Sequence, residues 1–259
     1  MNYMVYIINW DKVFDNTLKI EKEFIQNAIP HKIINSSDMQ IRGWINLGND
    51  SWATEQLYKI YADSVENKYD HIFILYGDVK PEMGTMSNVI TSSIQAIKKL
   101  NDCYIYTKSF THNHWGSPQI IIGDRGEGIK YICATDFSFV GLSIETYSFV
   151  YAMMEKFFQS FNIKDFKSAW GFDRIAWMYA LLTGNSIYRD MNMNMLHDIS
   201  QTGYDNSSAW AEMEATMING LNYLSKNLDV PWEKVNRMHD MLIEQYSKQI
   251  YTLEDFRSV

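Results

Sequence analysis

The sequence predicts an α/β fold: a mostly parallel sheet flanked by helices, followed by a C-terminal helical extension. In the first hundred residues, short β-branched and aromatic runs alternate with amphipathic segments, which is the pattern of strand–helix–strand units. After residue 200 the periodicity is helical only. We therefore expect a main domain over residues 1–200, made of halves 1–100 and 101–200, and an extension over residues 201–259.

Composition excludes several classes of protein. The chain has 259 residues, of which 46% are hydrophobic, enough for a sizeable core and too many for a disordered chain. No apolar run reaches the roughly 18 residues of a membrane span, and the first residues do not begin a signal peptide. Cys103 and Cys133 lie far apart, as expected for core residues in a reducing compartment. We expect a cytoplasmic protein.

The predicted strands of the first half place polar residues at their ends. The strands cover residues 3–8, 32–34, 44–47 and 71–76, and the helices cover 15–26, 52–64 and 86–100, the second of them capped by residues 48–51. In a parallel sheet, ligands sit beyond the carboxyl ends of the strands. The residues expected at that edge are Asn9, Asn35, Ser36, Gly77 and Asp78.

The second half contains shorter strands and one long helix. We expect strands over residues 102–106, 120–122, 131–134 and 137–142, with a hairpin turn at 123–126, and a helix over 144–158. In the extension, Ser207 and Ser208 are expected to cap one helix. A last helix is expected from about Pro231 to Lys248.

A helix, a turn and a strand close the main domain. The helix has an apolar face and runs from Asp173 to a stop at Gly184. Residues 191–195 alternate methionine and asparagine, which predicts a half-buried strand with a packed methionine face, and the strand ends near His197. This arrangement brings the Asp173 carboxylate and the His197 imidazole toward the same end of the unit.

Asp78 and His197 are the candidate metal ligands. Taken alone, Asp78 is an ordinary turn residue after glycine, and a lone histidine is more often structural than a ligand. Together they offer a carboxylate and an imidazole at one edge, which suits Mn²⁺ or Mg²⁺ with phosphate oxygens and water completing the shell. Asp173 lies in the first turn of its helix, where the dipole favours the ionised form. It would act as a base only beside an acceptor hydroxyl.

Other motifs point away from several enzyme classes. No Gly-x-Gly-x-x-Gly follows the first strand, and Walker and Gly-x-Ser-x-Gly motifs are absent, which argues against Rossmann dehydrogenases, P-loop enzymes and common hydrolases. His112 and His114 form a His-x-His pair with no neighbouring carboxylate. With Trp115 they favour an aromatic binding surface over a metal pair.

These features resemble the GT-A-fold glycosyltransferases over about residues 3–198. The resemblance implies a nucleotide-sugar-binding first half and an acceptor-binding second half. It also implies a metal-bound diphosphate at Asp78 and His197, and a catalytic carboxylate at Asp173. The usual aspartate motif has two carboxylates, whereas only Asp78 is present here. The implied donor-binding residues are Asn9, Asn35, Ser36, Gly77 and Asp78, and the implied acceptor-binding residues are His112, His114, Trp115, Trp170 and Arg174.

Residues 3–14, with Asn16 to Glu21, more narrowly resemble the T-even phage β-glucosyl-hydroxymethylcytosine α-glucosyltransferase family. That resemblance implies transfer from a UDP-linked sugar to modified double-stranded phage DNA, carrying hydroxymethylcytosine or a sugar already on it, in the host cytoplasm. It also implies a retained anomeric configuration, in which Asp173 orients the acceptor or stabilises charge; in an inverting transfer Asp173 would be the general base. Phosphate contacts would come from Lys108, Arg125, Lys130, Lys167 and Arg174.

Two alternatives to the DNA acceptor stay open. A net charge of −8 opposes general nucleic-acid binding and favours a polysaccharide or glycoconjugate acceptor, although residues 98–174 are nearly balanced in charge. The single aspartate of the metal motif is also compatible with a nucleotide-sugar-binding protein that has no turnover.

Overall fold

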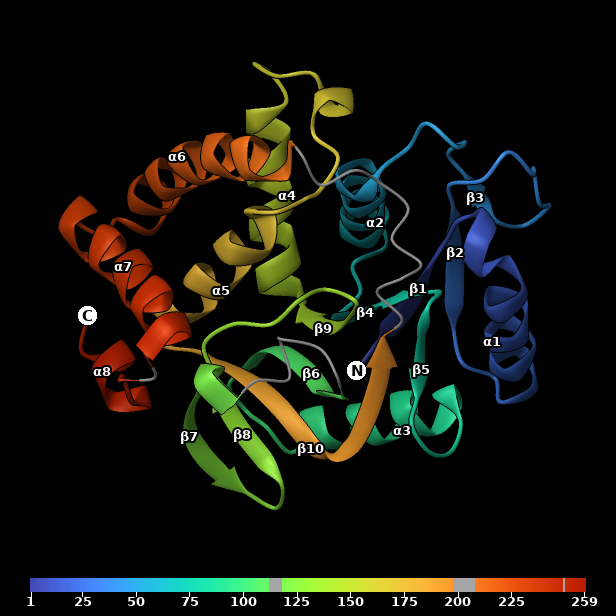
Figure 1. Cartoon of the computed structure of the whole chain (residues 1–259), viewed down its shortest axis with the longest axis horizontal. Coiled ribbons are helices and arrows are strands. Elements are labelled where there is room, and N and C mark those ends of the chain that lie inside the picture. Colours follow the sequence, from blue (N-terminus) through green and yellow to red (C-terminus); the bar gives the residue numbers. More distant parts are fainter. Residues whose placement is uncertain (112–117, 198–207, 249) are drawn as a thin grey trace.

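The computed structural model describes residues 1–111, 118–197, 208–248 and 250–259. At its centre lies one ten-stranded mixed sheet with the strand order β3-β2-β1-β4-β9-β6-β10-β8-β7, and with β5 paired to β10 (Figure 1). Helices cover both faces of this sheet. The predicted fold class is therefore confirmed.

The first four strands form the parallel part of the sheet. They are β1 (Tyr3–Asn9), β2 (His31–Asn35), β3 (Ile45–Asn46) and β4 (His71–Tyr76). The chain moves outward from β1 through β2 to β3, and then returns to place β4 on the other side of β1. This reversal leaves a crevice outside the carboxyl ends of β1 and β4, which is where open α/β sheets bind ligands.

The strands of the second half extend this edge. β9 (Phe139–Ser143) runs antiparallel to both β4 and β6 (Cys103–Thr111), and β10 (Ser186–His197) runs parallel to β6. Strands β4, β6 and β10 therefore end at the same edge. Directly after β4, the short β5 (Val79–Pro81) pairs antiparallel with the end of β10. The sequence did not predict β5, because a three-residue strand that ends in proline has no periodicity to detect.

The hairpin of β7 (Ile121–Gly126) and β8 (Ile129–Ile132) corrects one prediction. The turn is not at residues 123–126, which belong to β7. It is at Glu127 and Gly128, whose φ angles are 53° and 77°. Two consecutive positive φ angles match the twist of a two-residue hairpin turn.

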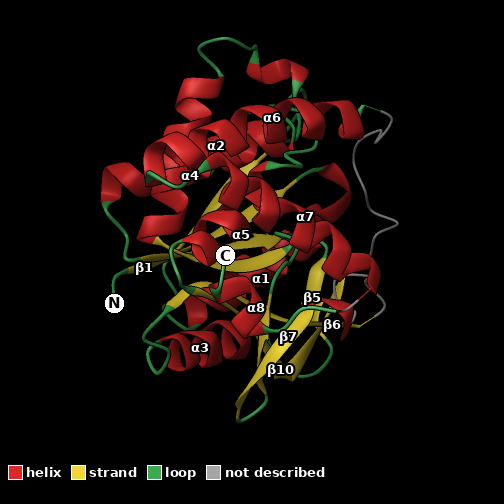
Figure 2. Cartoon of the chain, turned by 90° about the vertical axis from the view of Figure 1, so that its left-hand side faces the viewer, coloured by secondary structure: helices red, strands yellow, loops and turns green. Residues whose placement is uncertain are grey.

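Five helices of the main domain form the two outer layers. The first face carries α1 (Phe14–Gln26) and α3 (Met86–Ile97), and the second carries α2 (Ala53–Asn67), α4 (Ile144–Phe157) and α5 (Phe172–Leu182). Figures 1 and 2 show α3 on one side of the sheet and α2 and α4 on the other. No side chain caps α2, whose N-cap residue is Trp52, so the capping role predicted for residues 48–51 is wrong.

The C-terminal helices pack on the second face. α6 (Ala209–Leu228), α7 (Trp232–Lys248) and α8 (Leu253–Arg257) contact α5, and their buried residues join the same apolar core as α2, α4 and α5. The Ser208 side chain does not cap α6; its hydroxyl donates instead to Glu212 within the helix, and Ser207 lies outside the described residues. In the described part of the chain, no helix has both the length and the apolarity to cross a bilayer.

The methionine strand is less regular than its sequence suggests. The pairing of β10 with β6 shifts register between Asp190 and Asn194. Met195 is buried, but Met191 is 37% exposed beside the hairpin, so the methionines do not share one packed face. A bulge of this kind rotates the side chains that follow it and breaks the period of two.

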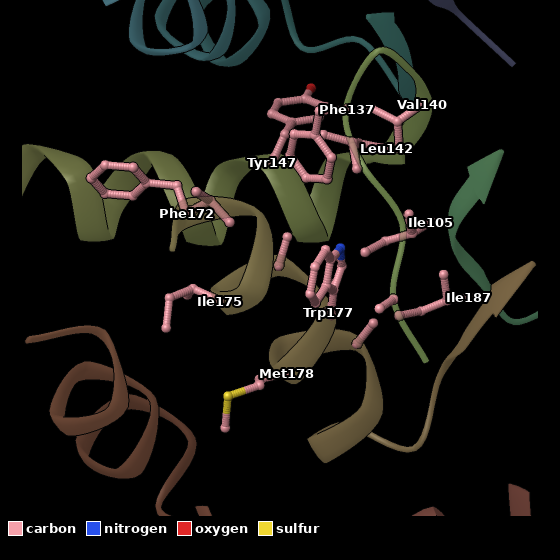
Figure 3. Close-up of a cluster of buried hydrophobic side chains, with 14 of the residues drawn as sticks. Ile105, Phe137, Val140, Leu142, Tyr147, Phe172, Ile175, Trp177, Met178 and Ile187 are labelled. Atoms are coloured by element: carbon pink, nitrogen blue, oxygen red, sulfur yellow. The ribbon is translucent and has the colours of Figure 1, made fainter. Parts of the chain in front are cut away.

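Packing around α5 fixes the position of its first turn. Figure 3 shows Trp177 of α5 beside Ile105 of β6 and Ile187 of β10, within a cluster of buried side chains. Trp177 is 3% exposed, and Phe172 at the start of the helix is fully buried. The first turn and the middle of this helix are therefore held against the sheet and its neighbours.

Candidate functional site

A cleft of about 950 Å³ opens at the sheet edge where β1 and β10 end. Its walls come from three parts of the chain: the ends of the first strands with the start of α2, the segment before β9, and helices α5 to α7. Lining residues include Ile8, Trp10, Lys12, Ser36, Trp52, Gln56, Asp78, Asp136, Ser138, Trp170, Asp173, Arg174, His197, Trp210, Met213, His239, Leu242, Ile243 and Tyr246.

Asp78 and His197 meet in this cleft. The Nε2 atom of His197 lies 3.2 Å from Oδ2 of Asp78, and the two side chains are 15% and 3% exposed, respectively. The other ring nitrogen, Nδ1, lies 3.2 Å from the hydroxyl oxygen of Ser138. A hydrogen bond at one ring nitrogen fixes the ring orientation, which is how proteins prepare a histidine to act as a ligand through the other.

The free oxygen of Asp78 fits a cation. Its Oδ1 atom is buried and accepts no hydrogen bond from the described residues. A buried carboxylate oxygen without a donor carries a desolvation cost that a bound cation removes. Within the described chain, no group of three or more His, Cys, Asp or Glu side chains gathers as a complete metal shell. Asp78 and His197 thus suit an ion that keeps most of its ligands from water or phosphate.

Asp173 lies at the start of α5 on the wall of the same cleft. The backbone N–H groups of Gly171 and Arg174 donate to its Oδ1, at 3.0 and 2.7 Å. Burial raises the pKa of this carboxyl to about 6, against the lowering effect of Arg174 and the two N–H groups, and with a further rise from the charge of Asp136. A carboxylate with a pKa near neutrality is suited to accept a proton.

Asp136 is a lining residue that the sequence analysis missed. Its Oδ1 accepts a hydrogen bond of 2.9 Å from the backbone N–H of Ser138, directly before β9. The sequence prediction considered only residues that follow the carboxyl ends of parallel strands, and Asp136 precedes its strand. Because β9 is antiparallel, its amino end lies at that edge instead.

Arg189 of β10, which does not line the cleft, is 1% exposed. Burial lowers the pKa of its guanidinium to about 10, opposed by the charges of Cys133 and Asp136. A buried arginine therefore lies within electrostatic reach of the cleft carboxylate Asp136.

Among the predicted donor-binding residues, only Ser36 and Asp78 line the cleft. Asn9 and Asn35 are fully buried, and the Nδ2 atom of Asn9 donates to Oδ1 of Asn35 at 2.8 Å. This bond ties the ends of β1 and β2 together. Gly77 is needed for packing, since a Cβ atom there would lie 2.6 Å from Val13.

Among the predicted acceptor-binding residues, Trp170 and Arg174 line the cleft, and the Trp170 ring meets that of Trp210 edge to face at 5.7 Å. His112, His114 and Trp115 lie outside the described residues. Helices α6 and α7 contribute six residues to the wall, none of which was predicted as a site residue. Their spacing in the sequence indicates an amphipathic helix and nothing more specific.

The basic residues predicted to contact phosphates are scattered. Lys108 is fully buried and pairs with Asp190 at 2.6 Å, so its assignment to a phosphate contact is wrong. Lys130 pairs with Asp124 on the β7–β8 hairpin, and the Lys167 ammonium lies over the Trp52 ring at 5.2 Å. Of the five candidates, only Arg174 lines the cleft.

Comparison with known proteins identifies the fold. No family model matches the sequence, and no curated protein does. Among solved structures, GalNAc-T7 with UDP, GalNAc and Mn²⁺ superposes with a TM-score of 0.56 and 7% identity, covering 100% of this chain and 56% of that one. The mannosyltransferase PcManGT from Pyrobaculum calidifontis, with GDP-Man and Mn²⁺, gives a TM-score of 0.49 and 6% identity over 98% and 84% of the chains. The superposition on GalNAc-T7 shows that the chain has a fold of the GT-A glycosyltransferase type.

Proposed function

We propose that this protein is a metal-dependent glycosyltransferase that takes its sugar from a nucleotide-linked donor, with UDP as the expected nucleotide. The observation that carries the proposal is the Asp78–His197 pair, in which a buried carboxylate oxygen lacks a donor among the described residues at the carboxyl end of β4. The fold shared with GalNAc-T7, a structure that contains UDP, GalNAc and Mn²⁺, supports a sugar nucleotide and a divalent metal here.

One side of the cleft would bind the donor and its metal ion, and the other side would bind the acceptor. Asp78 and His197 would hold Mn²⁺ or Mg²⁺, which when bound neutralises charge on the leaving diphosphate. Ser138 fixes the His197 ring, and Ser36, held by the Gln56 amide at 2.7 Å, lies on the nucleotide side. The aromatic walls formed by Trp10 and Trp52 at that side exclude water from the donor.

Asp173 is the residue that would act on the acceptor. In an inverting transfer its carboxylate accepts the proton of the attacking hydroxyl, and the pKa of about 6 keeps it largely ionised at pH 7. In a retaining transfer the leaving phosphate takes that proton, and Asp173 orients the acceptor. Either role requires the first turn of α5 to face the donor sugar across the cleft.

For the acceptor, the cleft favours a saccharide or glycoconjugate over DNA. Its far wall is aromatic and apolar, with Trp170, Trp210 and Tyr246, and such surfaces pack against sugar rings. The basic side chains expected to bind DNA phosphates are mostly paired or distant from the cleft. The modified-DNA acceptor implied by the opening residues stays a prediction, and so does a binding protein without turnover.

The test is a donor screen followed by an acceptor screen. The protein with Mn²⁺ is incubated with UDP- and GDP-linked sugars, and free nucleotide is measured with and without a chelator. We expect metal-dependent release of UDP from one donor. Glycan acceptors and hydroxymethylcytosine-containing DNA are then compared by mass spectrometry of the products. If the protein binds a nucleotide sugar but no donor is consumed with any acceptor, the binding-protein alternative is correct.

A further inference from the structure

The cleft end formed by α5, α6 and α7 combines an apolar wall with positive charge. His239, Leu242, Ile243 and Tyr246 of α7 all line the cleft. Their spacing of three, four and seven residues places them on one face of the helix. Ile243 is 50% exposed and Tyr246 38% exposed, so this face contacts solvent in the cleft as well as the protein core.

α6 completes the wall. Trp210 is 64% exposed, meets Trp170 edge to face, and lies three residues before Met213, which also lines the cleft. Large exposed apolar side chains that converge on one concave surface mark a binding site rather than ordinary surface. Figure 1 shows α6 and α7 beside α5, whose first turn carries Asp173.

Arg174 supplies the positive charge, and the His239 imidazole lines the same cleft. Arg174 follows Asp173 in the first turn of α5, and its guanidinium makes no ion pair within 4.0 Å among the described residues. Burial lowers the pKa of the His239 imidazole, and Arg174 lowers it further against the opposing charge of Asp240. Arg174 also opposes the rise that burial produces in the pKa of Tyr246. All three side chains line the same cleft.

A guanidinium without an ion pair among the described residues, in a cleft wall that also presents an imidazole, favours an anion. A guanidinium binds a carboxylate or phosphate through two parallel hydrogen bonds, and an adjacent imidazole gains a proton when an anion approaches.

We propose that the α5–α7 end of the cleft binds an acceptor saccharide that carries a negatively charged group. In this arrangement Arg174 and His239 contact the anion, and Trp210 and Tyr246 flank the sugar. The inference rests on the proposed function, because it assigns the acceptor class of the same site. The anionic group is a carboxylate, as in a uronic acid, or a phosphate ester, and the two share the chemistry that a guanidinium recognises.

The experiment measures binding rather than turnover. The full chain with Mn²⁺ is titrated with glucuronate, glucose 6-phosphate and glucose, with and without UDP, and tryptophan fluorescence and saturation-transfer NMR report binding. We expect at least one anionic sugar to bind about tenfold more tightly than glucose, since a charged hydrogen bond contributes about 1.5–3 kcal/mol. Comparison of the two anionic sugars separates a carboxylate site from a phosphate site.

Substitutions test which residues cause the preference for an anionic sugar. Arg174→Gln and His239→Gln should each remove most of the preference for the anionic sugar. Arg237→Gln, a matched control on α7 that pairs with Tyr251 and does not line the cleft, should leave it unchanged. Equal binding of all three sugars, no detectable binding of either anionic sugar, or an intact preference in Arg174→Gln overturns the inference. Weakened UDP binding in both variants with an unchanged sugar preference also overturns it, because the pair would then serve the donor.

The donor and acceptor results are read separately. If wild-type protein binds no nucleotide, the proposed function fails whatever the sugars do. If UDP binds and the anionic preference is absent, only the acceptor inference fails.

Discussion

The Nε2 atom of His197 lies 3.2 Å from Oδ2 of Asp78, although the two residues come from distant parts of the chain. The contact exists because β5, directly after Asp78, pairs with the end of β10 and places Val79 opposite His197. The metal site that we propose therefore depends on one short antiparallel pairing at the edge of the sheet.

The first prediction concerns this pair. Asp78→Asn and His197→Ala should each reduce Mn²⁺-stimulated donor turnover by about 10–100-fold, because each removes one of the two proposed metal ligands. Mn²⁺ should raise the melting temperature of wild-type protein and not that of the variants, since only a bound ion stabilises the folded state. Asp124→Asn, which breaks an ion pair on the distant hairpin, is the control. Normal metal dependence in His197→Ala would remove His197 from the site.

The second prediction concerns catalysis by Asp173. The pKa of its carboxyl is raised to about 6, so the ionised fraction falls tenfold for each pH unit below that value. In an inverting enzyme kcat/KM should fall in the same way, and Asp173→Asn should lose about 10²–10⁴-fold in kcat with donor binding unchanged. In a retaining enzyme the loss should be smaller and less dependent on pH. A loss below about threefold would exclude Asp173 from either role.

The third prediction concerns stability at the same residue. The raised pKa means that the unfolded chain loses this proton first as the pH rises from about 4 to 6, so the contribution of Asp173 to stability falls in that window. Asp173→Asn should then be more stable than wild type by about 1–3 kcal/mol at pH 7 and equally stable near pH 4. Urea unfolding at both pH values measures the difference. Asp165→Asn, at an exposed position, should show none.

The fourth prediction concerns Gly171, which precedes the first turn of α5 with a φ angle of 97°. A Cβ atom there would lie 2.9 Å from the Thr216 side chain of α6. Gly171→Ala should therefore cost about 1–3 kcal/mol and displace the Asp173 carboxylate that its N–H binds. Gly184→Ala also has a positive φ but meets no atom within 4 Å, so it separates backbone strain from the clash with α6. Equal losses in the two variants would contradict the role of the clash.

The fifth prediction concerns the buried ion pair between Lys108 and Asp190. The Asp190 carboxylate also accepts a hydrogen bond of 2.7 Å from the Tyr106 hydroxyl. Lys108→Met should cost about 3–5 kcal/mol, because it leaves Asp190 buried without its cation. The double variant Lys108→Met with Asp190→Leu should recover most of that loss. Additive losses in the double-mutant cycle would show that the two charges do not stabilise each other.

Several parts of this protein were determined by the sequence alone. Strands β1 and β4 are apolar runs bounded by polar residues, and helix α5 has an apolar face that begins at a carboxylate. These are local signals, set by side-chain spacing over one element. They were sufficient to identify the fold class, and to select Asp78 and Asp173, because each lies directly at the end of a recognisable element.

Only the tertiary structure decided how the site is assembled. It placed Asp136 at the edge through the antiparallel direction of β9, set the contact between the predicted partners His197 and Asp78 through β5, and added His239 from α7 to the cleft. It also buried Lys108, which the sequence presented as an available cation. Strand direction, strand order and helix docking depend on contacts between residues far apart in the chain. Periodicity reports which face of an element is apolar, and it contains no information about which partner covers that face.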